Sequence, residues 1–197
     1  MNNYEYIVAS LPVPGQDSLA PDASAVAEFI LGQCSPADAA VVQLLLDSFD
    51  RSKLDADFYA KALSCRNPFI REYLRFDLLV RNTKVEYLNR MLERPVDTDI
   101  IPLPGSDPDE RPSCPDYEQK PAVLDVLGQS DILARERGLD SLMWDKADEL
   151  TAMHLFDLDV ILAVVAKLMI TDRWTKLDPV TGRQMFRCLV QEIRNTR

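Results

Sequence analysis

The hydrophobic residues of this chain recur mostly at helical spacing, and the longest such pattern runs from residue 69 to about residue 93 without Gly or Pro. It follows Asn67-Pro68, an N-capping residue and a proline suited to a first helical turn. A helix of this length spans roughly 37 Å. Its apolar positions form two stripes about 100° apart, an arc wide enough to pack against more than one neighbour. The first stripe holds Phe69, Tyr73, Phe76, Val80, Tyr87 and Met91, the second holds Ile70, Leu74, Leu88 and Leu92, and the opposite polar side holds Arg71, Glu72, Arg75, Asn82, Glu86, Asn89, Arg90 and Glu93.

Helical patterns also cover most of the remaining chain. Residues 158–174 are apolar on every side, which predicts a buried helix. Residues 4–11 form a short aromatic and β-branched run before a proline-containing turn, and they predict an extended segment or short strand. The expected fold is therefore all-α, a multi-helix bundle of about seven or eight helices with a long central helix and a short extended N-terminal segment. The other helices are predicted at residues 22–32, 36–50, 55–64, 121–136 (ending near Gly138), 140–154 and 180–195.

A proline-rich segment interrupts the helical pattern at residues 94–121. Seven prolines fall within it, with acidic residues between them, and no helix tolerates that density of proline. We predict an extended loop, and long loops of this kind are commonly functional or disordered. The segment divides the chain into N-terminal and C-terminal helical parts at residues 1–93 and 122–197, which are expected to form one compact domain.

The charge balance narrows the classes of partner. The 197 residues carry 22 Lys and Arg against 32 Asp and Glu, a formal net charge of −10. Nucleic acid and anionic membrane surfaces both require clustered positive charge, so neither is an expected partner. Residues 66–94 differ from the rest, with seven Lys or Arg against four Asp or Glu. A basic ridge on an acidic protein could dock an acidic partner.

Several common functional signatures are missing from the sequence. Widely spaced cysteines with a single histidine disfavour a zinc site and are typical of reduced cytosolic thiols. No glycine-rich phosphate-binding loop occurs. The N-terminus lacks a secretory signal, and the longest apolar run, residues 160–170, contains Lys167 and is too short to cross a bilayer. We therefore expect a cytoplasmic protein without cofactor, metal or small-molecule ligand, peripheral to the inner membrane only through a complex. The cysteines are Cys34, Cys65, Cys114 and Cys188.

His154 is the only histidine and thus the first candidate for a general base. Carboxylates cluster around it at residues 145–159, and paired carboxylates can cleave glycosidic bonds or hold a metal. A structural interpretation competes with this one, because no nucleophile motif accompanies the histidine. Asp157 and Asp159 also flank a helix start, where acids stabilise the positive end of the helix. The acids are Asp145, Asp148, Glu149, Asp157 and Asp159.

Three charged residues of the long helix project into its apolar arc. Asp77 and Arg81 are four residues apart and can pair directly, and Lys84 follows one turn later. A charge that faces a core must be paired or hydrated, so these residues predict either a structural ion pair or a contact site for a partner. Trp144 and Trp174 lie near a helix start and a helix end, and they are candidates for core, lid or partner-binding positions.

Three segments resemble a bacterial family of unknown function. They are residues 4–12 (YEYIVASLP), 144–151 (WDKADELT) and 156–163 (FDLDVILA). Shorter matches follow in the C-terminal part of the chain. The shorter matches are Lys167-Leu168, Arg173-Trp174 and Leu177-Asp178.

The resemblance carries a functional expectation. Members of the family are encoded among V-type ATP synthase subunits in bacteria, which implies a stalk or coupling component that could stand in for the helical C/d subunit. Residues 73–82 with Lys84 resemble the long helices of that subunit. We expect a non-catalytic subunit or assembly partner of a V-type ATPase, active in ion transport, that contacts other protein subunits through the long helix and the proline-rich segment. The alternatives are a small acidic hydrolase or metal-binding enzyme that uses His154 with the carboxylates of residues 145–159, and a dimeric helical scaffold.

Overall fold

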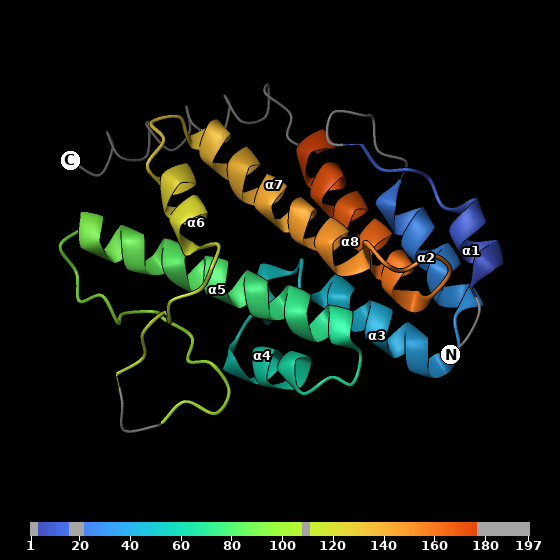
Figure 1. Cartoon of the computed structure of the whole chain (residues 1–197), viewed down its shortest axis with the longest axis horizontal. Coiled ribbons are helices and arrows are strands. Elements are labelled where there is room, and N and C mark those ends of the chain that lie inside the picture. Colours follow the sequence, from blue (N-terminus) through green and yellow to red (C-terminus); the bar gives the residue numbers. More distant parts are fainter. Residues whose placement is uncertain (1–3, 16–21, 108–110, 177–197) are drawn as a thin grey trace, which may run out of the picture.

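The computed structural model describes residues 4–15, 22–107 and 111–176. Over these ranges the chain contains eight α-helices, one short 3₁₀-helix and no strand, which confirms the predicted all-α fold. In Figure 1 the long helix α5 crosses the molecule, with α4 on one side and α6 and α7 on the other. The helices are α1 (Glu5–Ser10), α2 (Ala23–Gln33), α3 (Pro36–Asp47), η1 (Arg51–Lys53), α4 (Ala56–Leu63), α5 (Pro68–Met91), α6 (Lys120–Leu127), α7 (Ile132–Thr151) and α8 (Leu158–Thr175).

Most of these helices begin after a side chain that caps their first turn. Asn67 Oδ1 accepts a hydrogen bond from the Ile70 N–H at 2.9 Å, and Pro68 opens α5. Ser35 caps α3 in the same way and also precedes a proline. Each cap pairs a backbone donor that the first turn leaves without a helical partner. The predicted starts of α2 to α5 and of α8 therefore agree with the structure to within one residue. The other capping residues are Asp22, Asp55, Asp131 and Asp157.

Two apolar clusters hold the helices together. The larger cluster joins α2, α3, α8 and the first half of α5, and its members Leu45, Leu74 and Leu162 are fully buried. The smaller cluster joins the second half of α5 to α6 and α7 through Val80 and Val123. The long helix thus packs against several neighbours, as its wide apolar arc predicted. The prediction that residues 158–174 form a buried helix is confirmed as well.

The N-terminal segment is helical, so the predicted extended segment or short strand is wrong. The aromatic and β-branched composition of residues 4–11 suggested a strand, yet no strand lies among the described residues to pair with it. The apolar residues that face the larger cluster follow the spacing i, i+3, i+4, i+7, which is the helical pattern. They are Tyr4, Ile7, Val8 and Leu11.

The connection between α6 and α7 also differs from the prediction. The helix predicted to end near Gly138 ends at Leu127, and Asp131 then caps a second helix that runs straight through Gly138. A Cβ atom placed on Gly138 would lie 2.7 Å from Cγ1 of Val126 in α6. The glycine therefore permits the close packing of two helices and does not terminate one.

Two predictions fall on residues 177–197, outside the described residues: the helix at 180–195 and the thiol of Cys188. Among the described residues, Cys34, Cys65 and Cys114 are free thiols. None of the described helices is both long enough and apolar enough to span a membrane. The division of the chain into two helical parts within one domain stays a prediction.

Candidate functional site

The polar side of α5 carries two buried amides that bind the proline-rich segment. Asn82 Nδ2 donates to the Ile101 carbonyl at 2.7 Å, and Asn82 Oδ1 accepts from the Ile101 N–H at 3.2 Å. Asn89 Nδ2 donates to the Thr98 carbonyl at 2.7 Å. Both asparagines are buried, although the helical pattern placed them on the solvent side. An amide offers a donor and an acceptor, so it can pair with an irregular backbone that has no helix or sheet partner.

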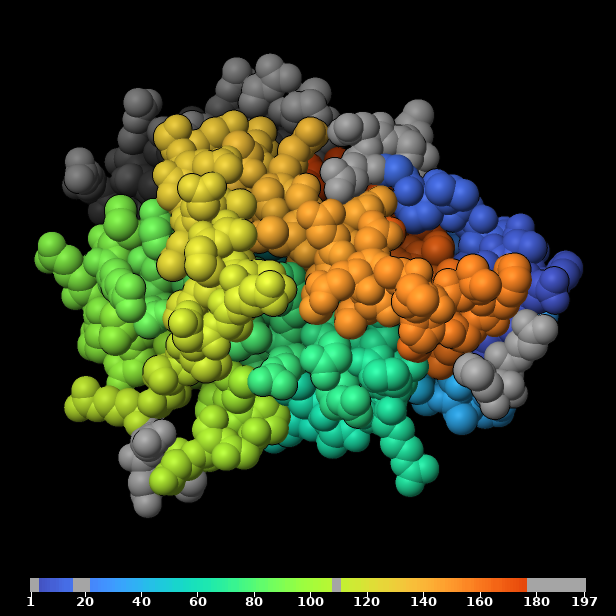
Figure 2. Space-filling model, in the orientation of Figure 1, coloured from blue at the N-terminus to red at the C-terminus, as the bar shows by residue number. Residues whose placement is uncertain are grey.

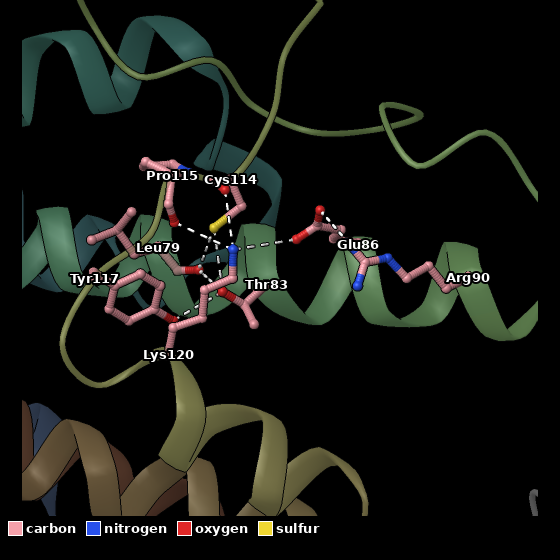
Figure 3. Close-up of polar contacts among 8 residues, drawn as sticks. All are labelled: Leu79, Thr83, Glu86, Arg90, Cys114, Pro115, Tyr117 and Lys120. Atoms are coloured by element: carbon pink, nitrogen blue, oxygen red, sulfur yellow. Dashed lines mark hydrogen bonds and ion pairs between the residues drawn. The ribbon is translucent and has the colours of Figure 1, made fainter.

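A second contact between α5 and the proline-rich segment involves Thr83, the residue that follows Asn82 (Figure 3). The Thr83 hydroxyl donates to the Leu79 carbonyl at 2.8 Å, and its oxygen lies 2.9 Å from the Tyr117 hydroxyl and 3.3 Å from Cys114 Sγ. Burial raises the pKa of the Cys114 thiol and raises the pKa of Tyr117 to about 12. Both groups are therefore protonated at neutral pH, and the cluster is a set of neutral hydrogen bonds without an activated nucleophile.

Lys120 completes this attachment at the start of α6. Its Nζ donates to the Cys114 carbonyl at 3.2 Å and lies 3.7 Å from Glu86, which also pairs with Arg90 at 2.9 Å. The proline-rich segment is thus fastened to α5 near its start, at Thr98 and Ile101, and near its end, from Cys114 to Lys120. No helix occurs in its described residues before Lys120, as the proline density predicted.

Sequence reasoning missed Thr83 and the two asparagines as attachment points. Asn and Thr are weaker helix formers than Ala, Leu or Lys, because their side chains compete for backbone hydrogen bonds. Three such residues in the second half of a long helix were therefore a signal that their side chains have specific partners.

A pocket of about 410 Å³ lies between α4 and the proline-rich segment. Its walls combine small and apolar side chains of both elements with a few charged ones. Three of the lining residues are prolines, whose rings fix their own backbone φ angle. The apolar and small lining residues are Ala56, Ala60, Pro102, Leu103, Pro104 and Pro112.

One face of the last turns of α5, opposite the side that holds Asn89, carries exposed apolar side chains. Leu88, Met91 and Leu92 are exposed, although they continue the two stripes that are buried nearer the start of the helix. Val96, just beyond the helix, is exposed as well. Neighbouring exposed apolar side chains of this size are typical of a protein-binding surface.

The charged residues of the predicted apolar arc contact other side chains of this chain. Asp77 accepts a hydrogen bond from the Tyr59 hydroxyl at 2.6 Å. Burial raises the pKa of Asp77, while this hydrogen bond and the charge of Arg81 oppose the increase. Arg81 acts on Asp77 only through its charge, and its Nε is buried without a hydrogen-bond partner among the described residues. Lys84 pairs with Glu136 of α7 at 2.5 Å.

Glu136 extends this contact to α8. Burial opposes ionisation of Glu136, but the hydrogen bond and charge of Lys84 lower its pKa overall. Arg173 lies 4.0 Å from Glu136 and pairs with Asp140, to which Trp174 Nε1 donates at 2.6 Å. Burial raises the pKa of Asp140, and both of these partners oppose the increase. The structure thus joins Lys84 and Trp174 in one polar network across α5, α7 and α8.

Both tryptophans line a pocket of about 190 Å³ between α7 and α8, together with Arg137 and Asp140. Trp144 is buried, and the Lys167 ammonium lies 4.9 Å from the centre of its ring. These contacts agree with the core and lid positions considered from the sequence. Partner binding stays a prediction for Asp77, Arg81, Lys84, Trp144 and Trp174.

His154 lies with two of the acids at the connection between α7 and α8. Its Nδ1 binds the Asp157 carboxylate and lies 3.8 Å from Asp159. Asp157 also caps α8 by accepting from the Val160 N–H, and Asp159 accepts from Asn67 Nδ2 at 2.6 Å. Each carboxylate therefore has a structural partner, and the cluster fastens the start of α8 to the start of α5.

The other acids near His154 lie apart from it on α7. Asp148 pairs with Lys167, Glu149 pairs with Lys146 at 2.9 Å, and Asp145 is exposed. Among the described residues, no group of three His, Cys, Asp or Glu side chains could hold a metal ion. The hydrolase or metalloenzyme alternative gains no support from this arrangement.

Replacing His154 with asparagine is expected to remove a pH-dependent contribution to stability. The hydrogen bond with Asp157 raises the pKa of His154, and the charges of Asp157 and Asp159 add to the increase. A raised pKa means that the imidazolium stabilises the folded state fully below its unfolded pKa of about 6.5 and that this stabilisation is lost as the pH rises through the folded pKa. The melting temperatures of wild type and variant, compared between about pH 5 and pH 9, should therefore differ most at the acidic end. A difference that is constant across this range would contradict the assignment.

Comparison with known protein families gives a match over the C-terminal part of the chain. A family model described as a protein of unknown function (DUF2764) matches residues 114–196, which include α6, α7 and α8. No curated protein and no solved structure matches the chain. The predicted resemblance to a family of unknown function is confirmed for these residues.

Proposed function

We propose that this protein is a non-catalytic subunit or assembly partner of a V-type ATPase, in which it acts as a stalk or coupling protein. The resemblance of residues 144–151 and 156–163 to a family encoded with such ATPases supports the proposal, and both segments lie within the matched residues. Its partners are other protein subunits of that ion-transporting complex.

The observation that carries the proposal is the joint surface of α5 and the proline-rich segment. Asn82 and Asn89 fix the segment against the helix, so the surface has its shape before a partner arrives. A surface that is already ordered loses less conformational entropy on binding. The uncovered Leu88, Met91 and Leu92 supply apolar anchors at the edge of this surface.

Co-purification with tagged V-type ATPase subunits from the native cell tests the proposal. The wild-type chain should elute with the tagged subunits, and a Met91→Asp, Leu92→Asp double variant should be lost from them. Both side chains are exposed, so the charges should leave the fold intact. Ile132→Asp is the control, because Ile132, in the first turn of α7, is about as exposed as Met91 and does not belong to the proposed surface.

Two results would contradict the proposal. The first is a V-type ATPase that assembles completely and pumps normally in cells lacking this chain. The second is equal recovery of wild type, double variant and control, which would remove the uncovered end of α5 as the contact surface.

A further inference from the structure

The pocket of about 190 Å³ between α7 and the last turns of α8 contains both tryptophans of the chain. Trp144 lines it from α7, and Ile170 and Trp174 line it from α8. The two helices run antiparallel in Figure 1, and in Figure 2 side chains of α7 form part of the visible face, with only small areas of α8 beside them. We call this cavity the tryptophan pocket.

The tryptophan pocket suits an apolar group better than a polar ligand. Asp140 already accepts from Trp174 Nε1 at 2.6 Å, and the Thr171 hydroxyl donates to the Lys167 carbonyl at 2.9 Å. The Arg137 guanidinium lies 5.1 Å from the centre of the Trp174 ring. The indole rings remain as apolar walls. A cavity of about 150 Å³ accepts benzene, so this pocket has room for one phenyl ring.

The chain itself continues beside this pocket. The described residues end two positions after Trp174, and residues 177–197 follow in the sequence. Pro179 disfavours a direct continuation of α8, so the helix predicted at 180–195 is expected to be a separate one. Its large apolar residues share one side at helical spacing, which is the pattern of a helix that covers a hydrophobic surface. They are Met185, Phe186, Leu189, Val190 and Ile193.

Three observations favour this segment as the occupant of the pocket. The family match extends to residue 196 and therefore joins the segment to α6, α7 and α8 in one unit. Phe186 follows Trp174 by twelve residues, and a short tether gives an effective concentration in roughly the millimolar range, which a separate molecule lacks. Residues 177–197 carry four arginines against two acids, whereas residues 1–176 carry 18 Lys and Arg against 30 Asp and Glu. The two parts therefore attract each other.

We propose that residues 180–195 dock against α7 and α8 as an amphipathic helix that places Phe186 in the tryptophan pocket. The contact is intramolecular, and it does not rest on the V-type ATPase proposal. A pocket that the chain fills itself leaves the joint surface of α5 and the proline-rich segment for other subunits. The two surfaces have no residue in common.

Tryptophan fluorescence of the full chain tests the docking directly, because both tryptophans line the pocket. A Met185→Ser, Phe186→Ser double variant should shift the emission to longer wavelength and increase quenching by acrylamide, since water and quencher then reach the indole rings. The matched control is Gln184→Ser, Gln191→Ser, which changes two residues on the opposite side of the same predicted helix. This control should have the emission and quenching of wild type.

Equal quenching of wild type and the Met185→Ser, Phe186→Ser variant would overturn the proposal. A control variant that is quenched as strongly as that double variant would overturn it as well, because the effect would then not depend on the apolar face.

Photochemical cross-linking separates docking from a general loss of structure. The Phe186→benzoylphenylalanine variant keeps an aromatic ring at position 186 and forms covalent bonds with its neighbours on irradiation. In a mixture of isotopically labelled and unlabelled chains, the cross-links should join residue 186 to peptides that contain Trp144 or Trp174 of the same chain. Cross-links between labelled and unlabelled chains would identify a second copy as the occupant. That result, cross-links elsewhere in the chain, or none at all would overturn the proposal.

Discussion

Replacing Asn82 with alanine is expected to lower the free energy of unfolding by about 2–4 kcal/mol and to release the proline-rich segment from α5. The variant would leave both the N–H and the carbonyl of Ile101 without their side-chain partner. An unpaired polar group that stays buried costs about 1–3 kcal/mol, so the cheaper response is for the segment to move into water. Asn82 is fully buried, so its truncation also leaves a cavity.

Urea unfolding measures the stability of this variant, and limited proteolysis reports the release of the segment. Thermolysin is the suitable protease because it cleaves before large aliphatic residues such as Ile100. Trypsin is unsuitable, since Arg94 and Arg111 both precede proline. The Arg90→Ala control removes only an exposed ion pair with Glu86 and should cost less than about 1 kcal/mol. Equal urea midpoints for the two variants, with the segment uncleaved in both, would contradict the proposed anchoring.

Local signals in the sequence account for the parts of the fold that could be predicted. Asn67-Pro68 and Ser35-Pro36 each combine a side-chain acceptor with a proline in the first turn, so the starts of α5 and α3 follow from neighbouring residues alone. The incorrect predictions concern residues whose structural role depends on contacts with residues distant in sequence. Gly138 resembles a helix terminator until α6 is placed against it.

The candidate sites were less predictable because their partners are distant in sequence. Lys84 was recognised as a charge facing the core, but its partner Glu136 lies 52 residues away on another helix. Asn82 was assigned to the solvent side because helical periodicity identifies faces and not what covers them. The backbone of the proline-rich segment covers that face, and such a segment has no periodic pattern from which its path could be predicted.

The exposed apolar side chains between α7 and α8 could not be predicted for a related reason. Leu155 and Phe156 resemble ordinary apolar residues beside a helix start, and a sequence pattern cannot tell whether another element covers them. Their exposure follows from the short connection between α7 and α8, which His154 and Asp157 hold in place by their own contact. Sequence alone therefore identified the charged cluster but not the apolar surface that it supports.

Replacing Gly138 with alanine is expected to destabilise the protein by about 1–3 kcal/mol, although alanine is the better helix former. The new methyl would lie 2.7 Å from Cγ1 and 3.1 Å from Cγ2 of Val126, and a β-branched side chain in a helix cannot rotate away from it. The matched control is Gly32→Ala in α2, where nothing lies within 4 Å and a gain of up to about 1 kcal/mol is expected. Urea unfolding of the two single variants should show that Gly138→Ala lowers the free energy of unfolding and that Gly32→Ala raises it.

A double-mutant cycle identifies the clash as the cause of that loss. Val126→Ala removes both methyl groups that the new Cβ would meet, so Gly138→Ala should cost at least about 1 kcal/mol less in the Val126→Ala background than in wild type. Sites that do not touch give additive effects, so an absence of coupling would show that α6 and α7 do not pack this closely. Stabilisation by Gly138→Ala similar to that by Gly32→Ala would also contradict the close packing. The close approach matters beyond this pair, because α6 also carries Lys120, which closes the attachment of the proline-rich segment to α5.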